Sequence, residues 1–317
     1  MEGLIPPPRR RAPRRAAPAK RFLRLPLILH GTLLRAIDHD CLNLAQSTAY
    51  SAIVSLFPAL IVAAAVISLL PDTTPVRFQL ALFFDRILPP DVSPLLQSYF
   101  VASPETIKST HALSLALLVS VTGASSVLAT LMEGVRRAND LPSNCWTFWQ
   151  RRRRAFLLVP LSLIPFALAS LLVVFGHYIT LWLALNVMPF ARTPVYILAL
   201  LLRWVVALTG SIGIVALIYH MGTPMQQSWK RTVPGAIMCT ATWFLATLIF
   251  GWYVTRFANY SQVYGSLGAG IALLFWLYII SLSVLCGAEF NTEFFRHFSP
   301  SSAAHSDTSP TNNLPHG

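Results

Sequence analysis

Charged residues are scarce in this chain. Only 11% of its 317 residues are charged, against about a quarter in soluble proteins, whereas 55% are hydrophobic. This balance excludes an ordinary soluble domain and predicts a membrane protein that crosses the bilayer several times. Cysteine is also rare: the four cysteines are far apart and form no C-x-x-C pair, so neither a disulfide framework nor a zinc site is predicted.

The sequence also lacks the motifs on which common enzyme classes depend. It contains no H-E-x-x-H, no G-x-S-x-G and no Walker lysine, and its eight histidines are scattered. A metal-dependent nuclease would need clustered carboxylates or histidines. We therefore expect no catalytic residues, no metal and no cofactor, and a membrane enzyme is the least favoured alternative.

Long apolar stretches indicate an all-α, polytopic membrane protein with six transmembrane helices. Each stretch is long enough to cross a hydrocarbon core of ~30 Å as a helix. Residues 71–110 carry charges of both signs and predict an external segment with short interfacial helices. The predicted spans cover residues 49–70, 111–132, 155–183, 195–219, 232–254 and 266–290, within a membrane domain of residues 49–298.

The two ends of the chain are predicted to lie in the cytoplasm. Nine basic residues precede the first span, three lie in residues 71–110 and six lie in the next loop, as the positive-inside rule requires of a cytoplasmic N-terminus. Residues 1–26 are rich in Pro and Arg and predict a disordered tail that contacts anionic lipid rather than nucleic acid. Residues 299–317 predict a second disordered cytoplasmic tail.

Residues 27–48 predict one amphipathic helix at the inner membrane surface. Leu33, Leu34 and Ile37 fall on one apolar stripe at helical spacing, and polar side chains occupy the other positions. Among these polar residues, His39 is interpreted as a solvated side chain and not as a ligand.

The most informative stretch extends from Val254 to Arg296. Small residues, Gly265, Gly268 and Gly270, mark the entry of the sixth span, where a neighbouring helix could approach closely. Gly287 repeats this feature at the exit, beside the carboxylate of Glu289. We therefore expect a helix that is packed inside the bundle, with these positions involved in helix packing and gating.

The same stretch carries a family resemblance. It contains F-A-N-Y-S-x-V-Y-G-S-L-G-A, with Tyr264 at the second tyrosine, and ends in G-A-E-x-N, with Asn291 as its last residue. Together with A-Y-S-A-I-V-S-L-F-P (residues 49–58) and V-P-G-A (residues 233–236), these motifs resemble the YihY/BrkB family of bacterial inner-membrane proteins. That family once carried a ribonuclease label, which the residues of this chain do not support, and its activity is not settled.

The resemblance also bears on the loop after the second span. This loop reads R-R-A-N-D and contains Arg136, Arg137 and Asn139. One hypothesis is that Glu289 contacts the loop that contains Arg136 and Arg137 and closes the inner side of the bundle, with Asn139 capping the loop. The alternative is that Glu289 and Glu293 simply belong to an interfacial helix end.

Arg203 is the one basic residue well inside an apolar run. A charge within a span costs ~2.5–3.5 kcal/mol on insertion scales, so it normally faces a partner or a wet cavity. Arg203 is therefore the candidate site for a substrate or an anion, unless it reaches the membrane surface with its long side chain. At the predicted depths it lies too far from Glu289 to form a pair.

Three functions remain open from the sequence. A transporter or lipid-handling protein of the bacterial envelope, acting on an unknown substrate such as an anionic lipid, is favoured by Arg203 and by spans interrupted by Pro and Gly. A structural or assembly factor is the second alternative and an enzyme the third. Membrane lipids, anionic ones above all, are the expected partners; a homo-oligomer is an open alternative, and no nucleic acid is expected.

Overall fold

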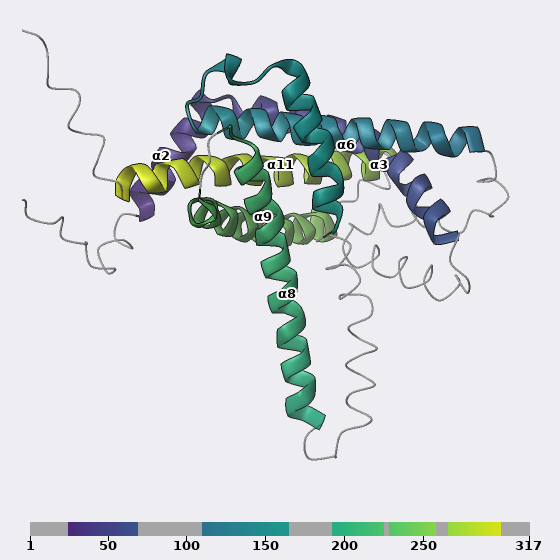
Figure 1. Cartoon of the computed structure of the whole chain (residues 1–317). Coiled ribbons are helices and arrows are strands. Elements are labelled where there is room, and N and C mark those ends of the chain that lie inside the picture. Colours follow the sequence, from purple (N-terminus) through teal and green to yellow (C-terminus); the bar gives the residue numbers. More distant parts are fainter. Residues whose placement is uncertain (1–24, 69–109, 165–191, 225–227, 258–265, 299–317) are drawn as a thin grey trace, which may run out of the picture.

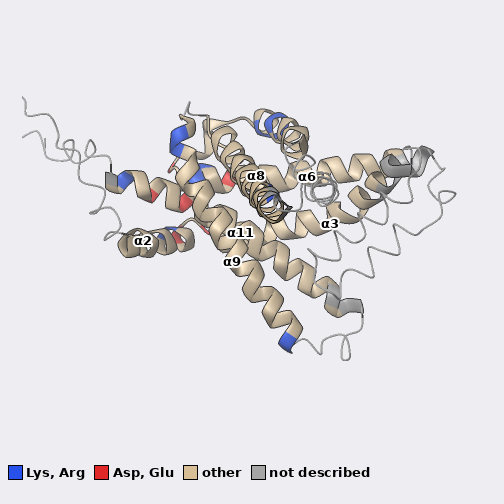
Figure 2. Ribbon diagram, turned by 90° about the horizontal axis from the view of Figure 1, so that it is seen from below, with Lys and Arg blue, Asp and Glu red and all other residues tan. Residues whose placement is uncertain are grey.

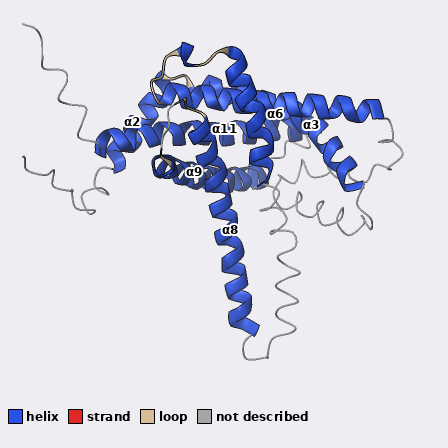
Figure 3. Ribbon diagram, in the orientation of Figure 1, coloured by secondary structure: helices blue, strands red, loops and turns tan. Residues whose placement is uncertain are grey.

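All regular structure in the described part of the chain is helical (Figure 3). The computed structural model describes residues 25–68, 110–164, 192–224, 228–257 and 266–298. The all-α prediction is confirmed over these ranges. The helices are α2 (Leu25–Asp38), α3 (Cys41–Ser68), α6 (Thr110–Ala138), α8 (Arg192–Met221), α9 (Trp229–Phe257) and α11 (Ser266–Phe298), with a short 3₁₀ turn at Ser143–Cys145 and a further helical stretch over residues 148–164.

Helix α11 lies at the centre of the arrangement and packs against α2, α3, α6 and α9 (Figure 1). The first half of α8 projects away from these helices, and its second half packs on α9. Charged residues of both signs gather at one end of the bundle, where α2 meets the last turns of α11 (Figure 2). That end holds the candidate site.

Four described helices are long and apolar enough to cross a membrane: 114–138, 196–221, 229–256 and 270–297. They correspond to the second, fourth, fifth and sixth predicted spans. The first predicted span lies in α3 as far as Ser68, and the third is helical as far as residue 164. Six spans are therefore not confirmed, and the predicted external segment, with the two tails up to residue 24 and from residue 299, lies outside the described residues.

The predicted amphipathic helix is interrupted in the structure. It breaks at His39 and Asp40, where Asp40 has a φ of 61°, and residues 41–48 continue into α3. Leu33 of its apolar stripe is 60% exposed, and the positions buried against the bundle are Ile28, Thr32 and Ala36. The small residues face α11 because the helices approach closely there: a Cβ at Gly31 would lie 3.0 Å from Glu293 Oε1.

Helices α9 and α11 cross through a pair of glycines. A Cβ placed on Gly235 would lie 2.5 Å from the carbonyl oxygen of Gly287, and a Cβ on Gly287 would lie 2.8 Å from the carbonyl oxygen of Gly235. Since both distances are shorter than any real Cβ contact, no other residue fits without a shift of the backbone. The Gly235 amide also donates to Asn291 Oδ1 at 3.1 Å, which fixes the register of the crossing.

Candidate functional site

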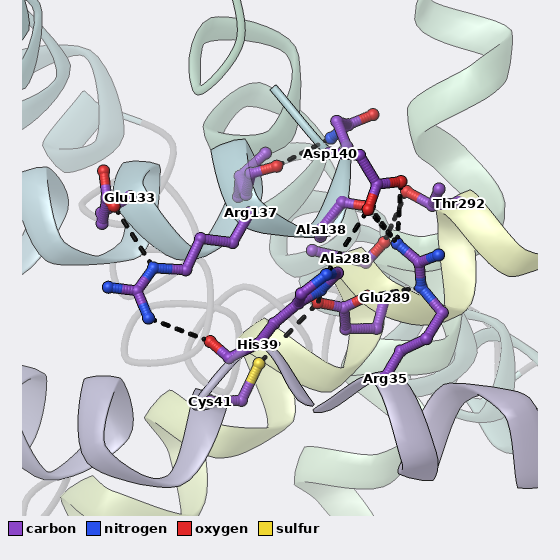
Figure 4. Close-up of polar contacts among 12 residues, drawn as sticks. Arg35, His39, Cys41, Glu133, Arg137, Ala138, Asp140, Ala288, Glu289 and Thr292 are labelled. Carbon is purple, nitrogen blue, oxygen red and sulfur yellow. Dashed lines mark hydrogen bonds and ion pairs between the residues drawn. The ribbon is translucent and has the colours of Figure 1, made fainter. Parts of the chain in front are cut away.

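The carboxylate of Glu289 is the centre of the charged cluster. Its side chain is 0% exposed, and both of its oxygens have partners from other helices (Figure 4). Arg35 Nε lies 3.1 Å from Oε2, and His39 Nδ1 lies 2.6 Å from Oε1. A buried carboxylate is tolerated only when charged or hydrogen-bonding partners replace its lost hydration. Here those partners come from α2 and from its junction with α3.

Arg35 joins α2 to two other segments of the bundle. Besides Glu289, its guanidinium donates to the carbonyl of Ala138 at 2.9 Å and lies 3.2 Å from Asp140 Oδ2. Burial, the largest single effect, lowers the pKa of Arg35, but the hydrogen bonds and charges of Glu289 and Asp140 together raise it above its ordinary value. The guanidinium therefore stays charged and links α2, the end of α6 and α11.

His39 occupies the junction between α2 and α3. Its Nε2 lies 3.5 Å from Asp140 Oδ1, while its Nδ1 faces Glu289, so the ring lies between two carboxylates. Its backbone carbonyl accepts a hydrogen bond from Arg137 at 3.1 Å. The interpretation of His39 as a solvated side chain is wrong: only 22% of the side chain is exposed, and both ring nitrogens have partners.

Cys41 completes the buried side of the cluster. Its Sγ lies 3.9 Å from Glu289 Oε1, and burial raises the pKa of the thiol to about 12, so it remains protonated and acts as a weak donor. Within the described ranges, no three His, Cys, Asp or Glu side chains are placed to hold a metal ion. The guanidinium of Arg35 occupies the position beside Glu289 that a cation would take.

A second acidic centre, Glu133 on α6, holds the two arginines of the loop that was predicted to contact Glu289. Arg136 lies 2.7 Å and Arg137 lies 3.3 Å from Glu133 Oε1, and Arg151 lies 3.2 Å from Oε2. In the described structure Arg136 and Arg137 therefore pair with Glu133 and not with Glu289. Helical spacing gives the reason, because residues three and four positions apart on α6 meet without any tertiary contact.

The loop after α6 nevertheless reaches the cluster through other residues. Asn139 donates from its side chain to the carbonyl of Val135 at 2.8 Å and so caps the end of α6. The next residue, Asp140, has a φ of 52° and turns its carboxylate toward Arg35 and His39. Arg296 at the end of α11 also pairs with Asp140. The end of α6 and its loop thus contact the cluster through Arg137, the carbonyl of Ala138 and Asp140.

The glycines predicted to pack the entry of the sixth span differ in their surroundings. Gly268 is buried, whereas a Cβ on Gly270 would have no atom within 4 Å in the described structure. Among the described residues, no close contact of the predicted kind is made at Gly270. Tyr264 and Gly265 lie outside the described residues.

Arg203 lies in the first half of α8, the part that projects from the bundle, and is partly exposed. Its neighbours are exposed apolar side chains such as Leu202 and Trp204. No side chain of the described residues forms an ion pair with it. The proposed cavity at Arg203 therefore remains a prediction.

Sequence reasoning missed Arg35 and Asp140 as members of the site. Arg35 lies 254 positions from Glu289, and no local pattern connects the two. A signal was nevertheless available: Arg35 and His39 lie four residues apart on one helical face, among the small residues Thr32 and Ala36. A cationic face lined by small residues indicates close packing against an acidic partner helix.

Comparison with known proteins places the chain in a family. The family model described as Virulence factor BrkB matches residues 32–311, which is most of the chain. The chain belongs to the BrkB family. The family resemblance predicted from the sequence motifs is therefore confirmed.

Several curated relatives match over most of their own length. A protein of Bacillus subtilis, YfkH, described as ribonuclease-like, is 26% identical over 80% of this chain and 90% of its own. UPF0761 membrane proteins of Tolumonas auensis and Alteromonas mediterranea are 25% and 27% identical, over 81% and 87% of this chain and 82% and 91% of theirs. No solved structure matches the chain. This chain is therefore a multi-pass membrane protein of the BrkB family.

Proposed function

We propose that this protein is a transporter or lipid-handling protein of the bacterial inner membrane, and that the Glu289 cluster closes its cytoplasmic end. The observation that carries the proposal is the complete burial of the Glu289 carboxylate between Arg35 and His39. In this conformation the cluster ties α2, the junction of α2 and α3, the end of α6 and α11 together at one end of the bundle.

Energetics favour a gate over a purely structural role for this cluster. A buried ion pair stabilises a fold no better than apolar side chains of similar size, since the desolvation penalty offsets the attraction between the charges. Stability alone therefore does not account for this buried ion pair, whereas a contact that opens and closes does. The break at Asp40 between α2 and α3 provides a hinge next to the ion pairs.

The second part of the proposal concerns the substrate. We propose that Arg203 provides a fixed positive charge for an anionic group, such as a lipid phosphate. Arginine suits this task because its guanidinium stays charged when it is partly desolvated and can bond two oxygens at once. Its place among exposed apolar side chains of α8 is compatible with a lipid substrate.

Both termini in the cytoplasm are part of this proposal, because the basic residues concentrate on the N-terminal side of the first span. We infer transport and not catalysis, because the ion pairs of the cluster leave Glu289 no oxygen without a partner. The ribonuclease-like description of the Bacillus subtilis relative applies to that protein.

A structural or assembly factor is the second candidate, and one observation favours it. The hydroxyls of α6 that could line a polar path donate to carbonyls of their own helix: Ser120 to Leu117, Ser125 to Thr122 and Thr130 to Ser126. Hydroxyls used in this way need no substrate. The close α9–α11 crossing is likewise accounted for by helix packing without a substrate.

Lipid movement in reconstituted vesicles separates the two candidates. Full-length protein is inserted into vesicles that contain fluorescent phosphatidylglycerol, and the fraction of probe reachable by an external quencher is followed over time. We expect faster movement than in protein-free vesicles, a loss of this gain in Arg203→Leu, and a changed rate in Glu289→Gln. Rates equal to those of protein-free vesicles in all samples would reject lipid handling and favour the scaffold.

A further inference from the structure

Arg152 is a partly buried cation whose partners are all neutral. It lies in the helical stretch of residues 148–164, where its Nη1 donates to Ser126 Oγ at 3.0 Å and its Nη2 to the carbonyl of Thr122 at 3.4 Å. Its guanidinium carbon lies 5.2 Å from the centre of the Phe156 ring. In the described part of the chain no carboxylate forms an ion pair with Arg152, although the adjacent Arg151 has one.

The surroundings of Arg152 have an excess of positive charge. One carboxylate, that of Glu133, is shared by three arginines: Arg136, Arg137 and Arg151. Asp40 adds one further carboxylate, 3.8 Å from Arg137, so among the described residues the arginines still outnumber the carboxylates and Arg152, next to Arg151, is not neutralised. A fixed cation without a counter-ion in this part of the chain, next to a cluster with an excess of arginines, attracts an anion from outside the protein.

The side chains around Arg152 are apolar and aromatic. Phe148 and Trp149 precede it by four and three residues, which places them beside it on the helix, and they are 62% and 75% exposed. Leu163, three turns further on the same face, is also exposed. Exposed aromatic residues at the end of an apolar helix are typical of the level of lipid head groups. An anion bound here thus has apolar surface directly beside it.

We propose that Arg152 binds the phosphate of an anionic phospholipid whose acyl chains lie along Phe156 and Leu163. Ser126 and Thr122 hold the guanidinium from one side, so its remaining N–H groups can donate to phosphate oxygens. A free phosphate would use the same charge but not the apolar face. This site is independent of the transport proposal and would exist in a scaffold as well.

Binding of defined lipids to the full-length protein tests the site. Native mass spectrometry of the protein in detergent is used to titrate phosphatidylglycerol, with phosphatidylcholine and inorganic phosphate as separate probes. We expect Arg152→Gln to weaken phosphatidylglycerol binding about tenfold, because one charge-assisted contact is lost. Arg153→Gln is the matched control: it removes the same charge one position away, from an exposed side chain, and binding should stay within about twofold.

Three results would overturn the proposal. Unchanged binding in Arg152→Gln would exclude the site, and an equal loss in Arg153→Gln would show that only the overall charge matters. Displacement of phosphatidylglycerol by an equal concentration of inorganic phosphate would show that the apolar face takes no part. If Arg152→Gln does not fold, Arg152→Lys is compared with Arg153→Lys instead, because lysine keeps the positive charge but lacks the planar guanidinium. Weaker phosphatidylglycerol binding in Arg152→Lys but not in Arg153→Lys supports the site.

Discussion

Replacing Glu289 by glutamine removes the charge at the centre of the cluster while keeping the shape of the side chain. Glu289 is fully buried, and its two oxygens hold Arg35 at 3.1 Å and His39 at 2.6 Å. Removing one partner of a buried ion pair costs ~3–5 kcal/mol. Arg35 keeps Asp140 and the carbonyl of Ala138, so we expect a loss near the lower end of that range. At roughly 2–4 °C per kcal/mol, the midpoint of thermal unfolding should fall by about 6–12 °C.

The same substitution one helical turn later provides the control. Glu293 pairs with His297 at 3.3 Å beside Gly31 of α2, and its side chain is 13% exposed, whereas that of Glu289 is fully buried. A pair that solvent still reaches contributes ~1 kcal/mol or less. Glu293→Gln should therefore shift the midpoint by no more than about 2 °C. The measurement is loss of helical signal on heating of the purified proteins in detergent. Equal midpoints for Glu289→Gln and Glu293→Gln would refute the buried ion-pair cluster.

Three further predictions follow from individual positions. Gly287→Ala should destabilise the protein by ~1–3 kcal/mol, because its Cβ meets the Gly235 carbonyl, whereas Gly270→Ala should be neutral; comparable melting of both variants would contradict the α9–α11 crossing. Arg203→Lys should reduce lipid movement and Arg203→Leu should abolish it at normal abundance, and full activity of Arg203→Leu would exclude the anion site. Reporter fusions after Glu105 should be external and those after Gln150 internal, and the reverse pattern would reject the topology.

Local patterns in the sequence predicted the helical class and the importance of α11. Gly287 and Glu289 lie in a short motif whose small residue and isolated carboxylate indicate packing at a helix crossing, and both are buried in the structure. The same argument failed at Gly270, because a small residue permits close approach but does not require it. Only the position of the neighbouring helix decides between the two cases.

The partners of Glu289 could not be predicted from local patterns. Apolar periodicity identified the stripe of Leu33 and Ile37 but not the opposite face, where close packing against the polar end of α11 selects Thr32 and Ala36. Arg136 and Arg137 lie in the loop that was expected to contact Glu289, yet a carboxylate three or four residues away on their own helix pairs with them. Contacts across more than 200 residues depend on helix positions that charge patterns do not determine.

Alkylation of Cys41 tests the central claim, that the cluster closes one end of the bundle and can open. Cys41 is 1% exposed beside Glu289, and Cys239, equally buried on α9, serves as the internal control. The variant designed to open the cluster is Arg35→Gln, which leaves the carboxylate of Glu289 in place. The charge of Glu289 helps to raise the pKa of the Cys41 thiol. Because this charge is kept, a faster reaction at Cys41 cannot result from its loss.

In vesicles that contain the full-length protein, N-ethylmaleimide should react slowly with Cys41 and with Cys239 of the unmodified chain. In Arg35→Gln, N-ethylmaleimide should react at least about tenfold faster with Cys41, and the rate at Cys239 should stay the same. The reason is that lowering the free energy of local opening by ~1.4 kcal/mol makes the open state ten times more populated. An unchanged rate at Cys41, or equal acceleration at Cys41 and Cys239, would contradict a gate at this end of the bundle.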